Sequence, residues 1–350
     1  MLVVLGMAAM LWGIGMVMGV SRQARLTLMG ALLALVLVLQ FALPDGHPVR
    51  EATGQSPALW LILAGAVGLI FAYSRLLRRL RERTEVKEAE DAPTKPAGTF
   101  TETELDRYAR HIVLRELGGP GQKRLKQARV LVIGAGGLGA PALQYLAAVG
   151  VGTIGVIDDD VVENANLQRQ VIHRDADIGV PKVFSAQMAM EAQNPAVAVR
   201  PYNRRLTVDI ASDLFAEYDL ILDGTDNFET RYLVNETAVR LGKPLISGAL
   251  AQWEGQLSIF HPADTGPCYQ CIFPEAPPPG LAPSCSEAGV IGPLPGVVGS
   301  MMAVEAVKLI TGAGATLKGE MLIYDALYGE SRKITLSKRA DCPVCGTGAA

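Results

Sequence analysis

The chain has 350 residues, of which 49% are hydrophobic and 19% are charged, and its formal net charge is -3. This composition excludes a disordered or fibrous protein, and a net charge so near zero gives no overall attraction to nucleic acid. Five cysteines are too few for a disulfide framework, and four of them form two Cys-x-x-Cys pairs, which favours metal binding. The mean hydropathy of +0.25 is high for a soluble protein. The apolar excess lies at the amino-terminal end, which predicts attachment to a membrane.

Three apolar stretches near the amino terminus predict membrane helices. They cover about residues 1–20, 26–43 and 58–74, and a bilayer is spanned by about 17 to 25 apolar residues. A secretory signal peptide is the alternative for the first stretch, disfavoured because no basic segment precedes it and no small-x-small cleavage pattern follows. A buried core helix is the alternative for the third.

Basic residues flank these stretches unevenly. Arg22 and Arg25 separate the first two stretches, and five arginines follow the third, whereas the loop 44–57 holds only Arg50. By the positive-inside rule, the amino terminus is external and everything after Arg75 is cytoplasmic. We therefore expect residues 1–83 to be a multi-pass anchor in the cell inner membrane, with the rest of the chain in the cytoplasm.

Residues 84–99 are predicted to form a flexible linker, because they are polar, alternate in charge and end in prolines and glycine. Thr101 and Glu104 then have the spacing of a capping box at the start of a helix. Short β-branched runs alternate with helical segments over residues 100–350, which predicts an α/β domain with a parallel sheet. The strand at 244–247 is expected to continue into Glu254–Phe260. The apolar side of the first helix would consist of Leu105, Tyr108, Ile112 and Leu117.

A strand at Arg129–Ile133 runs into a glycine-rich turn over residues 134–139, called the glycine turn below, and then into a helix over 140–149. This order places backbone N–H groups at a helix N-terminus, where they bind phosphate. Asp158 ends the next strand, roughly 20 residues downstream, where a carboxylate accepts hydrogen bonds from a ribose. The pattern predicts a doubly wound, Rossmann-like nucleotide site, and by itself favours a nicotinamide or flavin enzyme. Glycines that serve only helix packing are the alternative.

Further motifs separate these interpretations. Asn166-Leu167-Gln168-Arg169-Gln170, Pro181-Lys182 and Thr225-Asp226-Asn227 follow the glycine turn in order. With Arg107–Arg110, Glu254–Gln256, the run 284–290 and both cysteine pairs, they closely resemble the MoeB/ThiF/HesA family. These ubiquitin-activating-like adenylyltransferases activate sulfur-carrier proteins, and the resemblance is strongest to the molybdopterin-synthase adenylyltransferases. It covers about residues 101–346 and excludes residues 1–99.

The resemblance implies a role for each matching residue. Asp158 would hold the ribose of ATP, and Arg169 and Lys182 would stabilise the charge that adenylation develops on the α-phosphate and on pyrophosphate. Asp226 would act with Mg²⁺ at the reacting centre. Arg110 would reach the ATP of a neighbouring subunit, which implies a homodimer. The implied nucleotide-binding residues are Gly134, Gly136, Gly137, Gly139, Asp158, Asn166, Leu167, Gln168, Arg169, Lys182, Asp226 and Asn227.

Each of these roles has a simpler alternative. Arg169 and Lys182 could be a solvated surface pair, Asp226 could be a helix cap, and Arg110 could be a plain surface charge. The occurrence of all the motifs in order favours the functional interpretation.

The cysteine pairs predict a closed structural zinc site. They offer four soft ligands, Cys268, Cys271, Cys342 and Cys345, with no interleaved histidine or carboxylate. The metal would fasten the carboxyl end of the chain to the domain, and redox dithiols or unligated core thiols are the alternative.

The resemblance makes Cys285, the fifth thiol, a candidate for covalent capture of the activated carrier or of sulfur. A buried inert thiol is an equal alternative.

We therefore expect a membrane-anchored enzyme that uses ATP to adenylate the C-terminal glycine of a ubiquitin-like sulfur carrier. The resemblance favours the small subunit of molybdopterin synthase as the carrier, with the thiamine-pathway carrier as the alternative. A nicotinamide-dependent oxidoreductase is the alternative enzyme, disfavoured because hydride transfer needs no cations at a pyrophosphate leaving group. A catalytically silent membrane scaffold is the alternative of another class. The sequence leaves open the pathway, the sulfur source and the purpose of the anchor.

Overall fold

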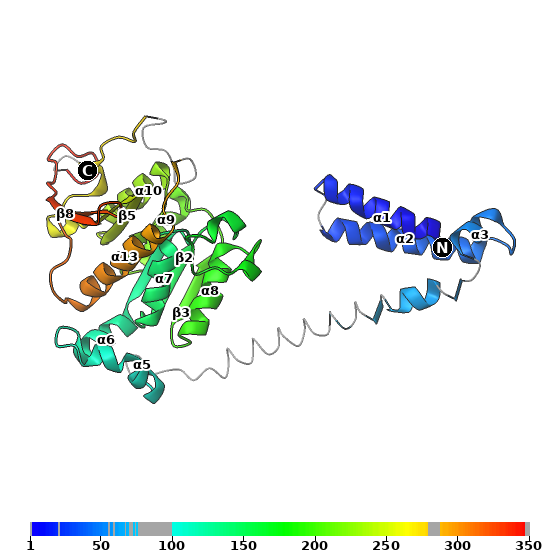
Figure 1. Cartoon of the computed structure of the whole chain (residues 1–350), viewed down its shortest axis with the longest axis horizontal. Helices are drawn as coiled ribbons and strands as arrows, with labels where there is room; N and C mark the ends of the chain where they lie inside the picture. Colours follow the sequence, from blue (N-terminus) through cyan, green and yellow to red (C-terminus); the bar gives the residue numbers. More distant parts are fainter. Residues whose placement is uncertain are drawn as a thin grey trace. The chain divides into compact units, whose positions relative to one another are not determined.

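The computed structural model describes residues 2–19, 22–54, 57–58, 60–66, 68–69, 73, 75, 100–278 and 288–346. The chain forms two compact units, Met1–Thr94 and Lys95–Ala350, which are taken separately below (Figure 1). The division between them falls within the predicted linker 84–99, whose residues lie outside the described part of the chain.

Two apolar helices form most of the first unit. α1 spans Leu2–Val17 and α2 spans Arg22–Ala42, and the two lie side by side (Figure 1). The helix-favouring leucine, methionine and alanine in these runs explain their conformation. The segment Ala24–Ala42 is long and apolar enough to cross a membrane, and only 11% of it is buried. The apolar part of α1, Gly6–Met16, is shorter.

The loop after α2 contains a short helix that the sequence did not suggest. α3 spans Pro48–Thr53 and begins with proline, whose missing N–H is harmless in a first turn. Buried Gln40 of α2 fastens this loop, because its side-chain amide donates to the carbonyl oxygens of Arg50 and Gly54 at 3.1 and 2.6 Å. Of the third apolar stretch, 58–74, the described residues are helical, and the others lie outside the described part.

An eight-stranded sheet is the frame of the second unit, with the order β3-β2-β1-β4-β5-β6-β7-β8. The strands from β3 to β5 are parallel, whereas β6, β7 and β8 are antiparallel. The chain winds outward in opposite directions from β1 and β4, which is the expected doubly wound arrangement. The strands are β1 (Arg129–Ile133), β2 (Thr153–Ile157), β3 (Ala198–Tyr202), β4 (Leu220–Asp223), β5 (Leu245–Ala251), β6 (Glu254–Phe260), β7 (Glu320–Asp325) and β8 (Glu330–Thr335).

The expectation of one continuous strand from 244 to 260 was wrong. The chain reverses after β5 at Gln252, whose φ is +38°, and β6 returns antiparallel with Phe260 opposite Leu245. Both strands are largely buried, and the sequence does not mark the reversal between them because glutamine has no strong preference for positive φ.

Helices cover both faces of the sheet (Figure 1). On one face, α7, α8 and α13 pack over Val130 and Val132 of β1; on the other, α9 and α10 pack over Leu131 and Ile133. Burial on both faces explains why β1 is an unbroken apolar run. The helices are α5 (Glu102–Ile112), α6 (Gly118–Gln127), α7 (Gly139–Ala148), α8 (Lys182–Gln193), α9 (Val208–Ala216), α10 (Phe228–Arg240), α11 (Tyr269–Ile272) and α13 (Pro293–Thr311), with 3-10 turns η1 (Asn164–Asn166), η2 (Asp175–Asp177) and η3 (Pro262–Asp264).

In two helices, α13 and α5, the burial of the side chains differs from what their composition alone suggests. α13 is long and apolar enough to cross a membrane, but half of it is buried in this core. In α5 the predicted capping box between Thr101 and Glu104 is confirmed. Its expected apolar side is wrong in part, because Leu105 is 47% exposed while Glu104 is buried in an ion pair with Lys126 at 2.8 Å.

Candidate active site

A cleft of about 1280 Å³ opens at the carboxyl ends of β1, β2 and β4. The strand order reverses here, between β1 and β4, and doubly wound sheets bind their ligands at this point. The fold brings together most of the residues that the sequence assigned to a nucleotide. Those that line the cleft are Gly134, Gly136, Gly137, Asp158, Asn166, Arg169, Lys182, Asp226 and Asn227.

Three assigned residues do not line the cleft in the described structure: Gly139, Leu167 and Gln168. Gly139 serves packing, since a Cβ there would lie 1.9 Å from the carbonyl oxygen of Gly134. Gln168 packs against the start of α13, where a Cβ on Gly292 would lie 2.7 Å from its Oε1. Leu167 is half-buried beside η1. Of the twelve residues assigned to the nucleotide from the sequence, the structure therefore keeps the nine that line the cleft.

The glycine turn joins β1 to α7. Gly134 has a φ of +90°, which favours glycine, and its N–H donates to the carbonyl oxygen of Ile157 in β2 at 2.9 Å. The next N–H, that of Ala135, donates to Asp158 Oδ2 at 2.7 Å. The turn is thus fastened to the end of β2, and its later residues lead directly into the N-terminus of α7.

Asp158 is the acidic residue at the end of β2. Its Oδ1 accepts the N–H of Asp160 at 2.8 Å, and its Oδ2 accepts that of Ala135. Burial raises the pKa of Asp158, and the positive charge of Lys182 opposes that shift. Each carboxylate oxygen keeps a second lone pair on the cleft side of the strand end, which can accept a hydrogen bond from a ribose hydroxyl.

The two predicted cations occupy different environments. Lys182 begins α8 and is only 5% exposed, and its Nζ lies 2.7 Å from Asp160 Oδ2. The guanidinium of Arg169 donates to the carbonyl oxygen of Ala165 and to Asn166 Oδ1, both at 3.3 Å. The alternative of a solvated surface pair is wrong for Lys182, since its ammonium is buried and paired with Asp160.

The Thr-Asp-Asn run follows β4 and begins beside the glycine turn, where a Cβ on Gly134 would lie 3.7 Å from Thr225 Cγ2. Asn227 is the N-cap of α10, and its Oδ1 accepts the N–H of Thr230 at 2.9 Å. The alternative of Asp226 as the helix cap is therefore wrong, because its neighbour has that role. The exposed Asp226 carboxylate belongs to the cleft wall instead.

A buried ion pair that the sequence analysis missed supports this run. Arg231 of α10 lies 3.5 Å from Asp223 Oδ2, and its guanidinium donates to the carbonyl oxygens of Thr225 and of Gly248, the latter at 2.7 Å. Asp223 Oδ1 in turn accepts the N–H of Thr225 at 3.0 Å. Both charged side chains are buried. The sequence showed only that Asp223 ends an apolar strand. An exposed carboxylate at a strand end has the same appearance, so the sequence did not reveal the buried pair.

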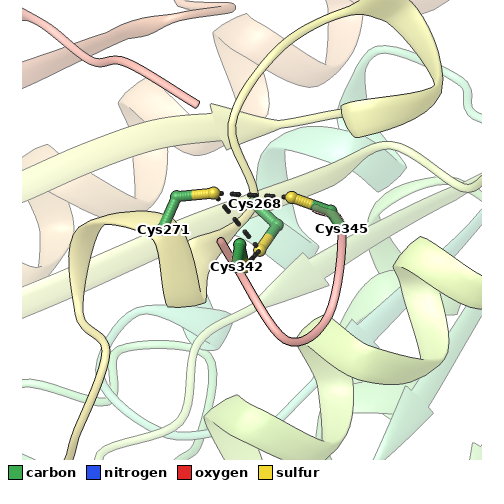
Figure 2. A group of neighbouring side chains, drawn as sticks. All are labelled: Cys268, Cys271, Cys342 and Cys345. Carbon is green, nitrogen blue, oxygen red and sulfur yellow. Dashed lines mark hydrogen bonds between the residues drawn. The ribbon is translucent and has the colours of Figure 1, made fainter. Parts of the chain in front are cut away.

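Four thiols form a second centre, between the start of α11 and the loop after β8. Figure 2 shows them pointing toward one another. Neighbouring sulfur atoms are 3.9 Å apart for Cys268 and Cys271, 3.6 Å for Cys268 and Cys342, and 3.4 Å for Cys271 and Cys345. A tetrahedral zinc ion, about 2.3 Å from each sulfur, holds the sulfurs about 3.8 Å apart. The arrangement therefore fits zinc, as the sequence predicted.

The surroundings of these thiols support metal binding. Burial raises the pKa of Cys268. Burial acts in the same direction on Cys342, but the backbone N–H groups of Cys345 and Val344 and the thiols of Cys268 and Cys271 together outweigh it and lower the pKa of Cys342 to about 7. The N–H of Arg339 also donates to Cys271 Sγ at 3.5 Å. Such donors stabilise thiolates, the form in which cysteine binds zinc.

Two further residues were assigned a role from the sequence. Arg110 is exposed on α5 and is absent from the described cleft wall. Cys285 lies outside the described residues.

Comparison with known proteins decides the family. The model of the ThiF family matches residues 108–344. The chain belongs to the ThiF family. It is 53% identical over 251 residues to the sulfur carrier protein adenylyltransferase of Thermus thermophilus, covering 71% of this chain and 93% of that relative.

Other ThiF-family relatives agree. A probable adenylyltransferase/sulfurtransferase, MoeZ of Mycobacterium tuberculosis, is 55% identical over 71% of this chain, which spans 64% of that relative's length. The SAMP-activating enzyme E1 of Haloferax volcanii is 50% identical, over 70% of this chain and 90% of that enzyme. The crystal structure of MccB from E. coli has a TM-score of 0.61 at 24% identity, covering 73% and 76%, hence the same fold. The expectation of an adenylyltransferase is confirmed, and the nicotinamide alternative is set aside.

Proposed function

We propose that this chain uses ATP to adenylate the C-terminal glycine of a small ubiquitin-like sulfur-carrier protein. The observation that carries the proposal is the cleft, which brings the glycine turn, Asp158, two cations and Asp226 to the switch point of the sheet. Relatives named as sulfur-carrier and SAMP-activating enzymes support the choice of substrate. In the reaction a carboxylate oxygen of the carrier attacks the α-phosphorus, the bond to the β-phosphate bridging oxygen breaks, and pyrophosphate leaves.

The residues on the cleft wall would divide this work. Asp158 would accept hydrogen bonds from the ribose, while the amides of the glycine turn and Asn166 orient the phosphates. Arg169 and Lys182 would stabilise the negative charge that grows as pyrophosphate departs. When Mg²⁺ is bound with ATP it supplies further charge neutralisation, and the Asp226 carboxylate on the cleft wall would be a hard oxygen ligand for it.

The carrier that we favour is the small subunit of molybdopterin synthase. The support is the strong resemblance of the ordered motifs to the molybdopterin-synthase adenylyltransferases, and the thiamine-pathway carrier is the second candidate. Exchange of labelled pyrophosphate into ATP tests both, with each purified carrier added separately. We expect exchange only with a carrier that ends in its intact terminal glycine, and faster with the molybdopterin-synthase subunit. A carrier lacking that glycine is the control, and exchange that ignores its removal would contradict the proposal.

The proposed assembly is a homodimer with a structural zinc ion in each chain. Arg110 would enter the cleft of the neighbouring subunit, where a further cation would contact ATP. The support is the exposure of Arg110 on α5 and its match to the family's motif. Zinc would join residues 268–271 to 342–345, and the support is the spacing of the four sulfurs.

We place the first unit in the cell inner membrane and the second in the cytoplasm. The support is the length and apolar composition of Ala24–Ala42 and the apolar side chains that α1 and α2 expose, such as Met10 and Val38. A reporter fused after Gly46 should be external and one fused after Arg83 internal, because arginines concentrate at the inner edges. Both reporters on the same side would contradict this topology.

A further inference from the structure

We propose that His173 is a positioning residue that holds the glycine turn in the conformation that binds the nucleotide. This inference rests on the proposed nucleotide site, and concerns a residue behind the turn rather than on the cleft wall. His173 is only 6% exposed. It precedes η2 and lies between the turn and α8, which begins with Lys182.

The imidazole of His173 joins the turn to α8 through both ring nitrogens. Its Nε2 lies 3.0 Å from the carbonyl oxygen of Ala135, and its Nδ1 lies 2.9 Å from Ser185 Oγ. A carbonyl oxygen only accepts hydrogen bonds, so Nε2 must carry a hydrogen. Ser185 Oγ also lies 2.7 Å from Asp177 Oδ2, and its single hydrogen can be donated either to that carboxylate or to Nδ1. The ring is therefore held in one plane with its Nε2–H aimed at the turn.

Ala135 is consequently held at both of its backbone polar groups. Its N–H donates to Asp158 at 2.7 Å, and its carbonyl oxygen accepts from His173. The residues on either side, Gly134 and Gly136, have no side chain to restrict them. Without these two hydrogen bonds, the turn would lose backbone entropy each time it ordered around phosphate, and affinity would fall accordingly.

The surroundings favour the neutral ring. Burial lowers the pKa of His173, and the charge of Lys182 acts in the same direction, while the hydrogen bond to Ala135 and the charge of Asp177 oppose it. In the neutral ring the hydrogen is on Nε2, so Nδ1 accepts the hydrogen of the Ser185 hydroxyl, and the ring adds no positive charge behind the turn. His173 thus orders the turn, while the charge that faces ATP comes from Lys182 and Arg169.

Two substitutions separate the contact with the turn from the contact with α8. In His173→Gln the side-chain amide nitrogen can occupy the place of Nε2 and still donate to Ala135. In His173→Asn the shorter amide reaches only the place of Nδ1, beside Ser185. Asn fills less space than Gln, so His173→Leu, which fills the space of the ring without donating, separates packing from the hydrogen bond and should resemble His173→Asn.

Hydrogen exchange of the full chain without nucleotide tests the hold on the turn directly. We expect exchange of the amides at 135–139 to rise about 10-fold in His173→Asn and by less than about 3-fold in His173→Gln, following the cost of an unpaired buried carbonyl. Ser185→Ala should give a smaller rise than His173→Asn. Equal exchange in the Asn and Gln variants would overturn the inference.

Equilibrium binding of Mg-ATP then links the turn to affinity. The dissociation constant should rise about 10-fold in His173→Asn and stay near the wild-type value in His173→Gln. His261→Asn is the matched control, because His261 also lies 3.3 Å from a backbone carbonyl, that of Gly242, but outside the cleft wall. An equal loss of affinity in both His173 variants would contradict the inference. A wild-type chain with a protected turn that binds no ATP would instead contradict the proposed function.

Discussion

Asp226 is the residue on which the proposed chemistry depends most. The cap of α10 is Asn227, so the neighbouring carboxylate is exposed to the cleft. Asp226→Ala should reduce carrier-dependent pyrophosphate exchange at least about 100-fold while ATP binding remains measurable, because metal placement is lost and adenosine recognition is kept. Asp209→Ala, which removes an exposed carboxylate in the first turn of α9, is the control. Exchange at the wild-type rate would remove Asp226 from the mechanism.

Among single residues, the sequence revealed the side chains that line the cleft and missed the buried side chains that hold them in place. Arg169, Lys182 and Asp226 could be found because each stands in a short motif after the glycine turn. Arg231 and Asp223 stand in no such motif, and only the packing of α10 against β4 and β5 makes them a buried pair. His173 stands in no such motif either, and its contact with Ala135 crosses 38 residues of chain.

The four-cysteine cluster joins the carboxyl-terminal loop to the rest of the second unit. The loop 339–346 follows the exposed edge strand β8 and reaches the core mainly through its cysteines. Binding free energy of a structural zinc ion is also folding free energy. Cys342→Ser should therefore abolish zinc retention and lower the melting temperature, by about 2–4 °C for each kcal/mol lost.

Zinc content by mass spectrometry and thermal unfolding check this prediction together. Cys285→Ser is the matched control and should retain one zinc per chain, because the four thiols of the cluster already complete a tetrahedral site. Equal loss of zinc in both variants would show that the ligand set is wrong.

Elements with a clear hydrophobic pattern could be predicted from the sequence, whereas reversals of the chain could not. β1 could be predicted because a strand buried on both faces is an apolar run with a turn at its end. The hairpin between β5 and β6 depends on the backbone of Gln252, a residue with no strong preference for positive φ. α3 depends on Gln40, a polar residue in an apolar helix whose partners are backbone carbonyls that no sequence motif marks.

At the scale of the assembly, the proposed homodimer places residues of two chains in each cleft. An Arg110→Ala chain mixed with an Asp226→Ala chain should regain part of the lost exchange activity, up to about a quarter of the wild-type sites by random pairing. The reason is that one of the two clefts in a mixed dimer contains both wild-type residues. Verified heterodimers are isolated with two affinity tags, and each parent homodimer is the control. Heterodimers as inactive as the parents would contradict a shared site.

The division of the whole chain into two units predicts that the second can work alone. A truncation that starts at Thr99 keeps Phe100, whose ring packs edge-on against Tyr108 at 6.2 Å, and keeps the Thr101 cap of α5. Every residue that lines the cleft lies between Ile133 and Met321. We therefore expect a soluble protein with zinc and dimer content like the full chain, and exchange activity within about 3-fold of it, since the core of the second unit is complete without the removed residues.

Activity of the truncated protein is measured beside that of the full chain in detergent and in lipid vesicles, with the same carrier. If the truncated protein is folded, zinc-bound and dimeric but cannot adenylate the carrier, the membrane unit takes part in the reaction and is more than a tether. Restoration by vesicles alone, in the absence of residues 1–98, would point to the lipid surface. Equal activity in all three preparations is the expected result, because an anchor fixes where the carrier is activated without altering the cleft in which ATP reacts.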